Sequence, residues 1–206
     1  MKKIQLEAKT SHGALEYTFM DMVLPTESLH PYQDKSKFDT LCKSGCINYG
    51  KKWSCPPYSP EYAKFTVSYK YINLIMLTIN TDQLEYIHQD FLKIKAANVI
   101  LKSRIDKTLR LVMDKNEYYI STGSCRLCRS CMKKNNKVCC HPDLRTYSLE
   151  SLGIDVEKVT EDIFQTKLLW YKKKEEIPKY TSIVAGLLTN NPYQSTKIID
   201  KLVQIQ

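Results

Sequence analysis

The residues with the clearest chemical potential are eight cysteines, which fall into two short windows. The first window contains Cys42, Cys46 and Cys55, and the second contains Cys125, Cys128, Cys131, Cys139 and Cys140. Positions 56–124 contain no cysteine. Secreted disulfide scaffolds are usually shorter and spread their cysteines more evenly, whereas clustered thiols in a reducing compartment are typical of metal sites. The clustering therefore predicts a cytoplasmic metal-binding protein.

The spacing of the second window predicts an iron–sulfur cluster of the [4Fe–4S] type. Cys125, Cys128 and Cys131 are separated by two residues each, so their thiolates can converge on a cube of iron and sulfide. In bacterial ferredoxins the same C-x2-C-x2-C run is accompanied by a distant cysteine that precedes proline. Either Cys55, which precedes a proline, or Cys139 could supply the fourth thiolate. Zinc sites usually pair two separate C-x2-C knuckles, and three cysteines in a row are less usual for zinc, so zinc is the less favoured, alternative cofactor.

The first window predicts a second metal centre, which makes one or two clusters in all. Its pattern is Cys42-x3-Cys46-x8-Cys55, followed by two prolines that stiffen the chain. The x3 opening resembles a radical-SAM signature, but the third cysteine of that signature is missing here. Adjacent side chains of extended backbone point to opposite faces, so we expect only one of Cys139 and Cys140 to serve the second-window cluster. Cys140 would then be a spare thiol or the fourth ligand of the first-window centre.

Three stretches of the chain are similar to a family of predicted metal-binding proteins, a cysteine-rich domain of unknown function in bacteria and archaea. These stretches are CINYGKKWSCPP at 46–57, GSCRLCRSC at 123–131 and SLESLGIDV at 148–156. The resemblance extends from about Cys42 to Leu188 and implies an iron–sulfur protein. It also implies that Cys139 is the fourth second-window ligand, because the family has the pattern C-x2-C-x2-C-x7-C. Cys140 departs from the family, which tends to have arginine at this position.

The charge of the chain indicates what kind of partner to expect. Lysine and arginine number 31 against 22 acidic residues, which gives a formal net charge of +9. Five of the basic residues lie in or beside the second window: Arg126, Arg129, Lys133, Lys134 and Lys137. They predict thiols of lowered pKa and a surface for an acidic redox partner protein, or else a solvated loop. Nucleic acid is the less favoured partner.

The chain lacks the motifs of the commonest enzyme classes. Its six glycines form neither a dinucleotide-binding fingerprint nor a phosphate-binding loop, and no nucleophile elbow is present. No apolar stretch is long enough to span a membrane, and no signal peptide is recognisable. We therefore expect an electron-transfer or accessory redox protein. The alternatives are a zinc-stabilised interaction or nucleic-acid-binding module, and an enzyme whose first-window cluster has an open iron.

Three other side chains near the windows are weaker candidates for metal binding or for shielding the site. His141 follows Cys140 and is a candidate ligand, although a surface histidine explains it equally well. Tyr49 and Trp53 lie between Cys46 and Cys55, where they would shield a metal site from water or pack the loop onto the core.

The strand signals predict a sheet with buried central strands. Alternating apolar residues at 4–6 and 15–19 indicate a hairpin. The nearly continuous apolar run at 71–79 predicts a central strand buried on both faces, and 180–189 predicts a second buried strand. A short strand is expected at 117–122, directly before the second cysteine window.

The helix signals complete an α+β fold. A short helix at 32–40 leads to Cys42, and an apolar stripe behind a capping box at 82–85 predicts one long helix, or two in succession, over 82–113. Short helical pieces are expected at 148–152 and 155–164. We expect a single domain over 1–206, with a mixed or antiparallel sheet, flanking helices and two cysteine-rich loops.

Overall fold

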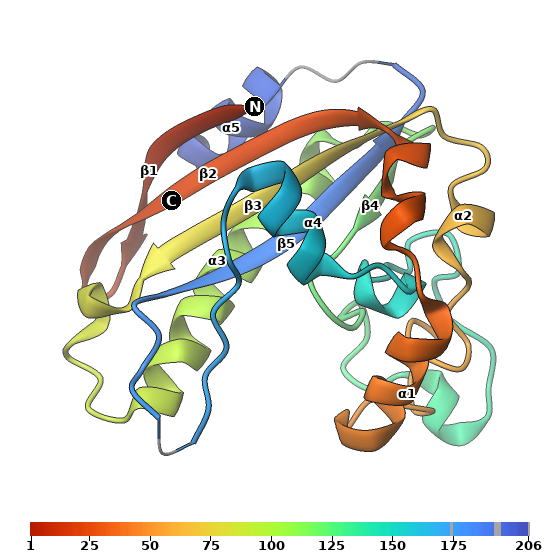
Figure 1. The fold of residues 1–206 in the computed structure, drawn as a ribbon, viewed down its shortest axis with the longest axis horizontal. Coiled ribbons are helices and arrows are strands. Elements are labelled where there is room, and N and C mark those ends of the chain that lie inside the picture. The colour runs from red at the N-terminus through yellow and green to blue at the C-terminus, as the bar shows by residue number, and fades with distance from the viewer. Residues whose placement is uncertain (174, 192–194, 206) are drawn as a thin grey trace.

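Five strands form one antiparallel sheet with the order β1-β2-β3-β5-β4 (Figure 1). The strands are β1 Lys2–Thr10, β2 Gly13–Pro25, β3 Tyr71–Asn80, β4 Tyr118–Ile120 and β5 Tyr180–Thr189. The computed structural model describes residues 1–173, 175–191 and 195–205. The α+β class and the predicted strands are confirmed, including the N-terminal hairpin and the short strand before the second window.

Helices cover both faces of this sheet. They are α1 Lys35–Gly45, α2 Tyr62–Phe65, α3 Asp90–Val112, α4 Val156–Phe164 and α5 Ser195–Gln204, with short 3-10 helices η1 Thr26–Tyr32, η2 Thr81–Leu84, η3 Met132–Asn135 and η4 Glu150–Leu152. Helices α3 and α5 pack on one face, and η1, η4 and α4 pack on the other (Figure 1). No helix in the described ranges is long and apolar enough to cross a membrane.

Strand β3 is the centre of the packing, because its side chains alternate between two hydrophobic clusters. Ile75, Leu77 and Ile79 join the cluster beneath α3 and α5. The intervening residues Ile72, Leu74 and Met76 join the cluster beneath α4 and η4. The prediction of a central strand buried on both faces is therefore confirmed.

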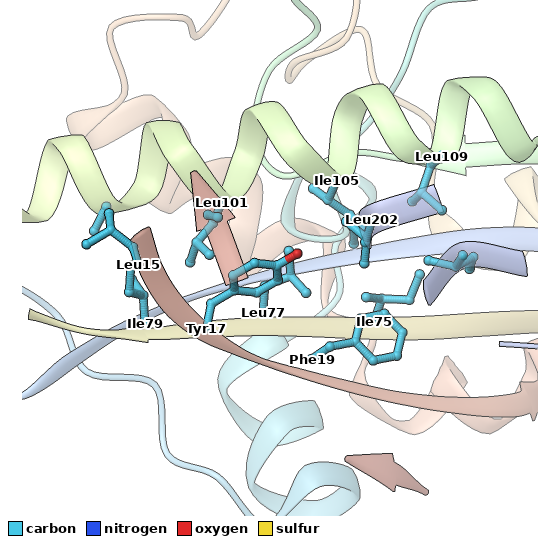
Figure 2. Close-up of a cluster of buried hydrophobic side chains, with 14 of the residues drawn as sticks. Leu15, Tyr17, Phe19, Ile75, Leu77, Ile79, Leu101, Ile105, Leu109 and Leu202 are labelled. Atoms are coloured by element: carbon cyan, nitrogen blue, oxygen red, sulfur yellow. The ribbon is translucent and has the colours of Figure 1, made fainter. Parts of the chain in front are cut away.

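The cluster on the α3 face holds the long helix against the sheet. Leu101, Ile105 and Leu109 of α3 point toward the strands (Figure 2). They meet Tyr17 and Phe19 of β2, and all five side chains are at most 1% exposed. Burying one such side chain contributes roughly 1.5–3 kcal/mol, so this layer fixes α3 on the sheet.

The predicted start of the long helix is wrong. Residues 81–84 form the separate 3-10 turn η2, without a side-chain cap, and α3 begins only at Asp90. Tertiary contacts hold this turn in place: the Gln83 side chain exchanges two hydrogen bonds with the backbone of Glu16, at 2.7 and 2.9 Å. Backbone N–H of Thr81 also donates to the Lys179 carbonyl at 3.0 Å. These bonds hold residues 81–84 as a short 3-10 turn that is separate from α3.

Helix α1, which carries Cys42, is attached to the turn between η4 and α4. Backbone N–H of Asp34 donates to the Gly153 carbonyl at 2.7 Å, and the Lys37 ammonium pairs with the Asp155 carboxylate at 2.9 Å. Burial raises the pKa of Asp155, but the Lys37 ammonium and the Lys158 N–H more than offset this, so the net pKa lies below its usual value. The pair is therefore ionised at neutral pH.

Gly153 provides the first test of this attachment. It has a φ of +95°, and a Cβ there would lie 2.8 Å from the Lys35 Cα and 3.0 Å from the Lys35 nitrogen. Gly153→Ala should therefore lower the unfolding free energy by about 2–4 kcal/mol, measured by urea denaturation. Gly45→Ala is the matched control, because Gly45 has open space around its Cα. An equal effect of the two substitutions would contradict the proposed close contact.

Candidate metal centre

The two cysteine windows, distant in sequence, lie against each other in the structure. The Lys52 ammonium donates to the Ser124 hydroxyl at 3.0 Å and to the Cys125 carbonyl at 3.1 Å. The Trp53 indole donates to the Lys137 carbonyl at 2.9 Å. Figure 1 shows α1 and the loop after β4 at the same end of the molecule, beneath the sheet. The 52–54 segment thus joins the first window to the second.

Ser54 forms the most buried part of this junction, with 1% of its surface exposed. Its hydroxyl accepts a hydrogen bond from the Cys125 backbone N–H at 3.1 Å. The same oxygen lies 3.8 Å from the Cys55 sulfur. One buried hydroxyl therefore contacts a cysteine of each window, and it satisfies a backbone donor that would otherwise be unpaired.

A small cavity brings together four cysteines of the second window. It is lined by Cys125, Cys128, Cys131 and Cys139, together with Lys52, Trp53, Ser54, Leu127, His141 and Arg145. Cys140 is exposed and is not among the lining residues. The four lining cysteines are those of the C-x2-C-x2-C-x7-C pattern, and His141 lies beside them.

The chain reaches this cavity through a turn that ends β4. Backbone N–H of Ser121 donates to the Tyr147 carbonyl at 2.8 Å instead of continuing the ladder with β5. Gly123 then adopts a φ of +80°, a conformation that side chains with a Cβ rarely adopt. The turn directs Cys125 and the following loop away from the sheet and toward the first window.

The thiols of the second window interact electrostatically. Desolvation raises the pKa of Cys128, and the charges of Cys140, Cys125, Cys139 and Cys131 raise it further, so the lowered pKa predicted from the basic residues is wrong for this thiol. Crowded thiolates repel one another, so a bound cation would stabilise the deprotonated set. Cys140 thus lies within electrostatic range of Cys128, although it does not line the cavity.

The first-window cysteines form a second group. Cys42 lies in the last turn of α1, and Cys46 caps that helix with its N–H on the Cys42 carbonyl at 3.0 Å. Burial raises the pKa of Cys42, and Cys46 and Cys55 raise it further. Burial also raises the pKa of Cys55, with smaller effects that include the charge of Cys131 in the other window. Cys55 is therefore within electrostatic range of both groups.

Arg145 complements the charge of the second-window cavity. It lines the cavity, and its buried Nε has no hydrogen-bond partner among the described residues. Its guanidinium lies 5.1 Å from the centre of the Tyr147 ring. An unpaired guanidinium donor beside four thiols fits a group that carries negative charge, such as a metal–thiolate assembly. Throughout the described ranges, no three His, Cys, Asp or Glu side chains are grouped closely enough to hold one metal ion.

The aromatic and basic residues predicted near the site have distinct positions. Trp53 lines the cavity, whereas Tyr49 does not. The Lys133 ammonium lies 4.9 Å from the Trp53 ring centre and 4.4 Å from that of Tyr58, so it packs on the aromatic rings. Lys134 and Lys137 are exposed.

Sequence patterns did not identify three residues that build the site: Lys52, Ser54 and Arg145. Lys52 and Ser54 are adjacent to recognised residues, but their hydrogen bonds cross from one window to the other. Such long-range contacts leave no spacing pattern in a single sequence. Arg145 follows the second window, and no ligand spacing in the sequence singles it out.

The fold and the site define a class: an α+β protein in which four thiols of the second cysteine window line a cavity, with residues 52–54 of the first window beside them. The chain belongs to the family described as predicted metal-binding protein (DUF2284), whose family model matches residues 28–188. The matched region runs from η1 to the end of β5 and includes both cysteine windows. No curated protein and no solved structure matches the chain.

Replacing Ser54 tests the junction between the windows. Ser54→Ala leaves the Cys125 N–H without its partner, which costs about 1–3 kcal/mol. Because this bond orients a lining cysteine, we expect metal affinity to fall about tenfold, measured by competition with a chelator. Ser44→Ala is the control, since the exposed Ser44 hydroxyl bonds only within its own helix. Equal metal retention by both variants would exclude this role for Ser54.

Proposed function

We propose that this protein binds a [4Fe–4S] cluster through Cys125, Cys128, Cys131 and Cys139. The observation that carries the proposal is that these four cysteines line one cavity. Their C-x2-C-x2-C spacing is the ligand run of bacterial ferredoxins and is uncommon for zinc. Four thiolate donors with an adjacent guanidinium suit the negative charge of such a cluster.

The surrounding residues have roles that follow from their contacts. A bound [4Fe–4S] cluster supplies one-electron transfer at a potential set by its protein environment. Trp53 and Leu127 line the cavity and limit access of water to it. Arg145 has an unpaired Nε donor for sulfur or thiolate, which favours the more negative, reduced state.

We also propose that Cys42, Cys46 and Cys55 form a second metal centre, which requires their thiols to move closer together, because no three potential ligands in the described ranges are grouped around one ion. These three thiols are close enough for their charges to act on one another. Three cysteines leave a fourth position for another ligand. Cys140 is the less favoured fourth ligand, because its charge acts on Cys128 in the second window.

An electron-transfer or accessory redox role, in the cytoplasm, accounts best for these features. The exposed Lys134 and Lys137 lie on the loop that surrounds the cavity. Complementary charge speeds association of redox proteins, so this loop suits an acidic partner protein.

Metal analysis tests the identity of the centre. Protein purified without oxygen should be brown and should contain iron and acid-labile sulfide in similar amounts. The expectation follows from four thiolates at iron–sulfur spacing. Colourless protein with stoichiometric zinc and no sulfide would replace the proposal with a zinc-stabilised interaction module.

Two adjacent cysteines provide a matched pair for the ligand assignment. Cys139→Ser should lose the iron of one cluster, because Cys139 lines the cavity. Cys140→Ser should retain it, because Cys140 is exposed outside that cavity. Iron and sulfide per chain, with the visible absorption spectrum, provide the measurement. The reverse result, with iron lost only from Cys140→Ser, would falsify the assignment.

A further inference from the structure

A second and larger cavity lies beside the metal site. Its volume is about 490 Å³, and it is lined by residues of α3, β5, the turn after β4 and the 150–170 segment. Cavities of roughly 300–1,000 Å³ are typical of sites for small organic molecules. Helices α3 and α4 lie on opposite faces of the sheet (Figure 1), so this cavity is at the sheet edge between the two layers.

The cavity exists because β4 is short. The ladder between β4 and β5 ends at the pair Ile120–Gly186, and the chain then turns away at Ser121. Residues 180–185 of β5 therefore pair with β3, and among the described residues no strand lies on their other side. Ser182, Ile183 and Val184 of this open edge form one wall of the cavity.

Large apolar side chains surround the cavity without being buried. Phe91 is 57% exposed, Val99 is 47% exposed and Trp170 is 61% exposed, and all three line it. Phe91 continues the apolar periodicity of α3, but it is exposed rather than part of the core. Exposed aromatic and aliphatic groups that surround a concave site are typical of a ligand-binding surface.

The charges on the cavity wall are mostly positive. Lys95, Lys102 and Arg126 line it, and Glu150 is the one acidic lining residue among those described. Lys102 is only 7% exposed, and its ammonium donates to the Thr122 carbonyl. Within the described ranges, Lys102 forms no ion pair with a carboxylate. An ammonium has three donors, so a buried lysine bonded to one carbonyl can still bind an anion.

The two cavities share a segment of chain. Gly123 and Arg126 line the larger cavity, whereas Cys125 between them lines the metal cavity. A Cβ at Gly123 would lie 3.6 Å from the Lys102 nitrogen, so this turn passes directly beside the buried ammonium. A molecule in the larger cavity would therefore lie next to the loop that holds the second-window thiols.

We propose that the larger cavity binds a small aromatic carboxylate, with its ring among Phe91, Val99 and Trp170 and its carboxylate at Lys102 and Arg126. The apolar rim and the excess of cations together select this chemistry over a neutral or cationic molecule. The site is independent of which metal the cysteines hold, so it goes beyond the proposed function.

Isothermal titration calorimetry with 2-naphthoate tests the proposal on the metal-loaded, full-length protein. The neutral 2-naphthamide has the same ring system and is the matched probe for charge. We expect saturable binding of one 2-naphthoate per chain, at least about tenfold tighter than 2-naphthamide. Absence of saturable binding, or equal affinity for the two probes, would overturn the proposal.

Paired variants test whether 2-naphthoate binds in this cavity. Arg126→Gln should weaken 2-naphthoate binding about fivefold or more, whereas Arg129→Gln, on an exposed arginine of the same loop, should leave it unchanged. Val99→Asp should abolish binding, whereas Leu111→Asp, at an exposed apolar position of the same helix, should not. Iron content and circular dichroism of each variant show whether the metal site and the fold are intact.

The outcomes separate this proposal from the metal assignment. Selective loss of binding in Arg126→Gln and Val99→Asp, with full metal content, supports the ligand site whether the metal is iron or zinc. Equal losses in each variant and its control would show that 2-naphthoate binds elsewhere, and would overturn the assignment of this cavity.

Discussion

The contact between the two cysteine windows is the constraint on which the site depends. Thiolates from positions as far apart as Cys55 and Cys125 can act together only if their loops are held in contact. Lys52, Ser54 and Trp53 provide that contact through hydrogen bonds to the second-window loop. Each bond satisfies a polar group at or near the junction, so removing one disturbs both thiol groups. Metal binding would reinforce the same junction, which couples metal affinity to folding.

The sheet determines where this junction is formed. Strand β3, buried on both faces, fixes α3 on one side and the η4–α4 region on the other. Helix α1 attaches to that second layer through Gly153 and the Lys37–Asp155 pair, which places Cys42. Strand β4, at one edge of the sheet, delivers the second window. The early end of β4 positions Cys125 and also leaves the larger cavity open beside it.

The two cavities differ in the chemistry of their linings. The smaller one concentrates thiols and a guanidinium, which suits a metal–sulfur group. The larger one combines exposed aromatic side chains with cations, which suits an organic anion. Because the 123–126 segment contributes to both walls, occupancy of one cavity can affect the loop of the other. An electron-transfer protein needs only the first cavity, so the second is the feature that extends its proposed role.

Local patterns in the sequence determined the strands, the α+β class, the cysteine windows and the family resemblance, because periodicity and ligand spacing depend on neighbouring residues. The tertiary structure decided what depends on contacts between distant segments. The hydrogen bonds of Gln83 to Glu16 hold η2 as a turn separate from α3. Phe91 is exposed at a cavity, and the Ser54 hydroxyl joins the two windows. These outcomes arise from packing and hydrogen bonds across the fold, which no spacing along the chain encodes.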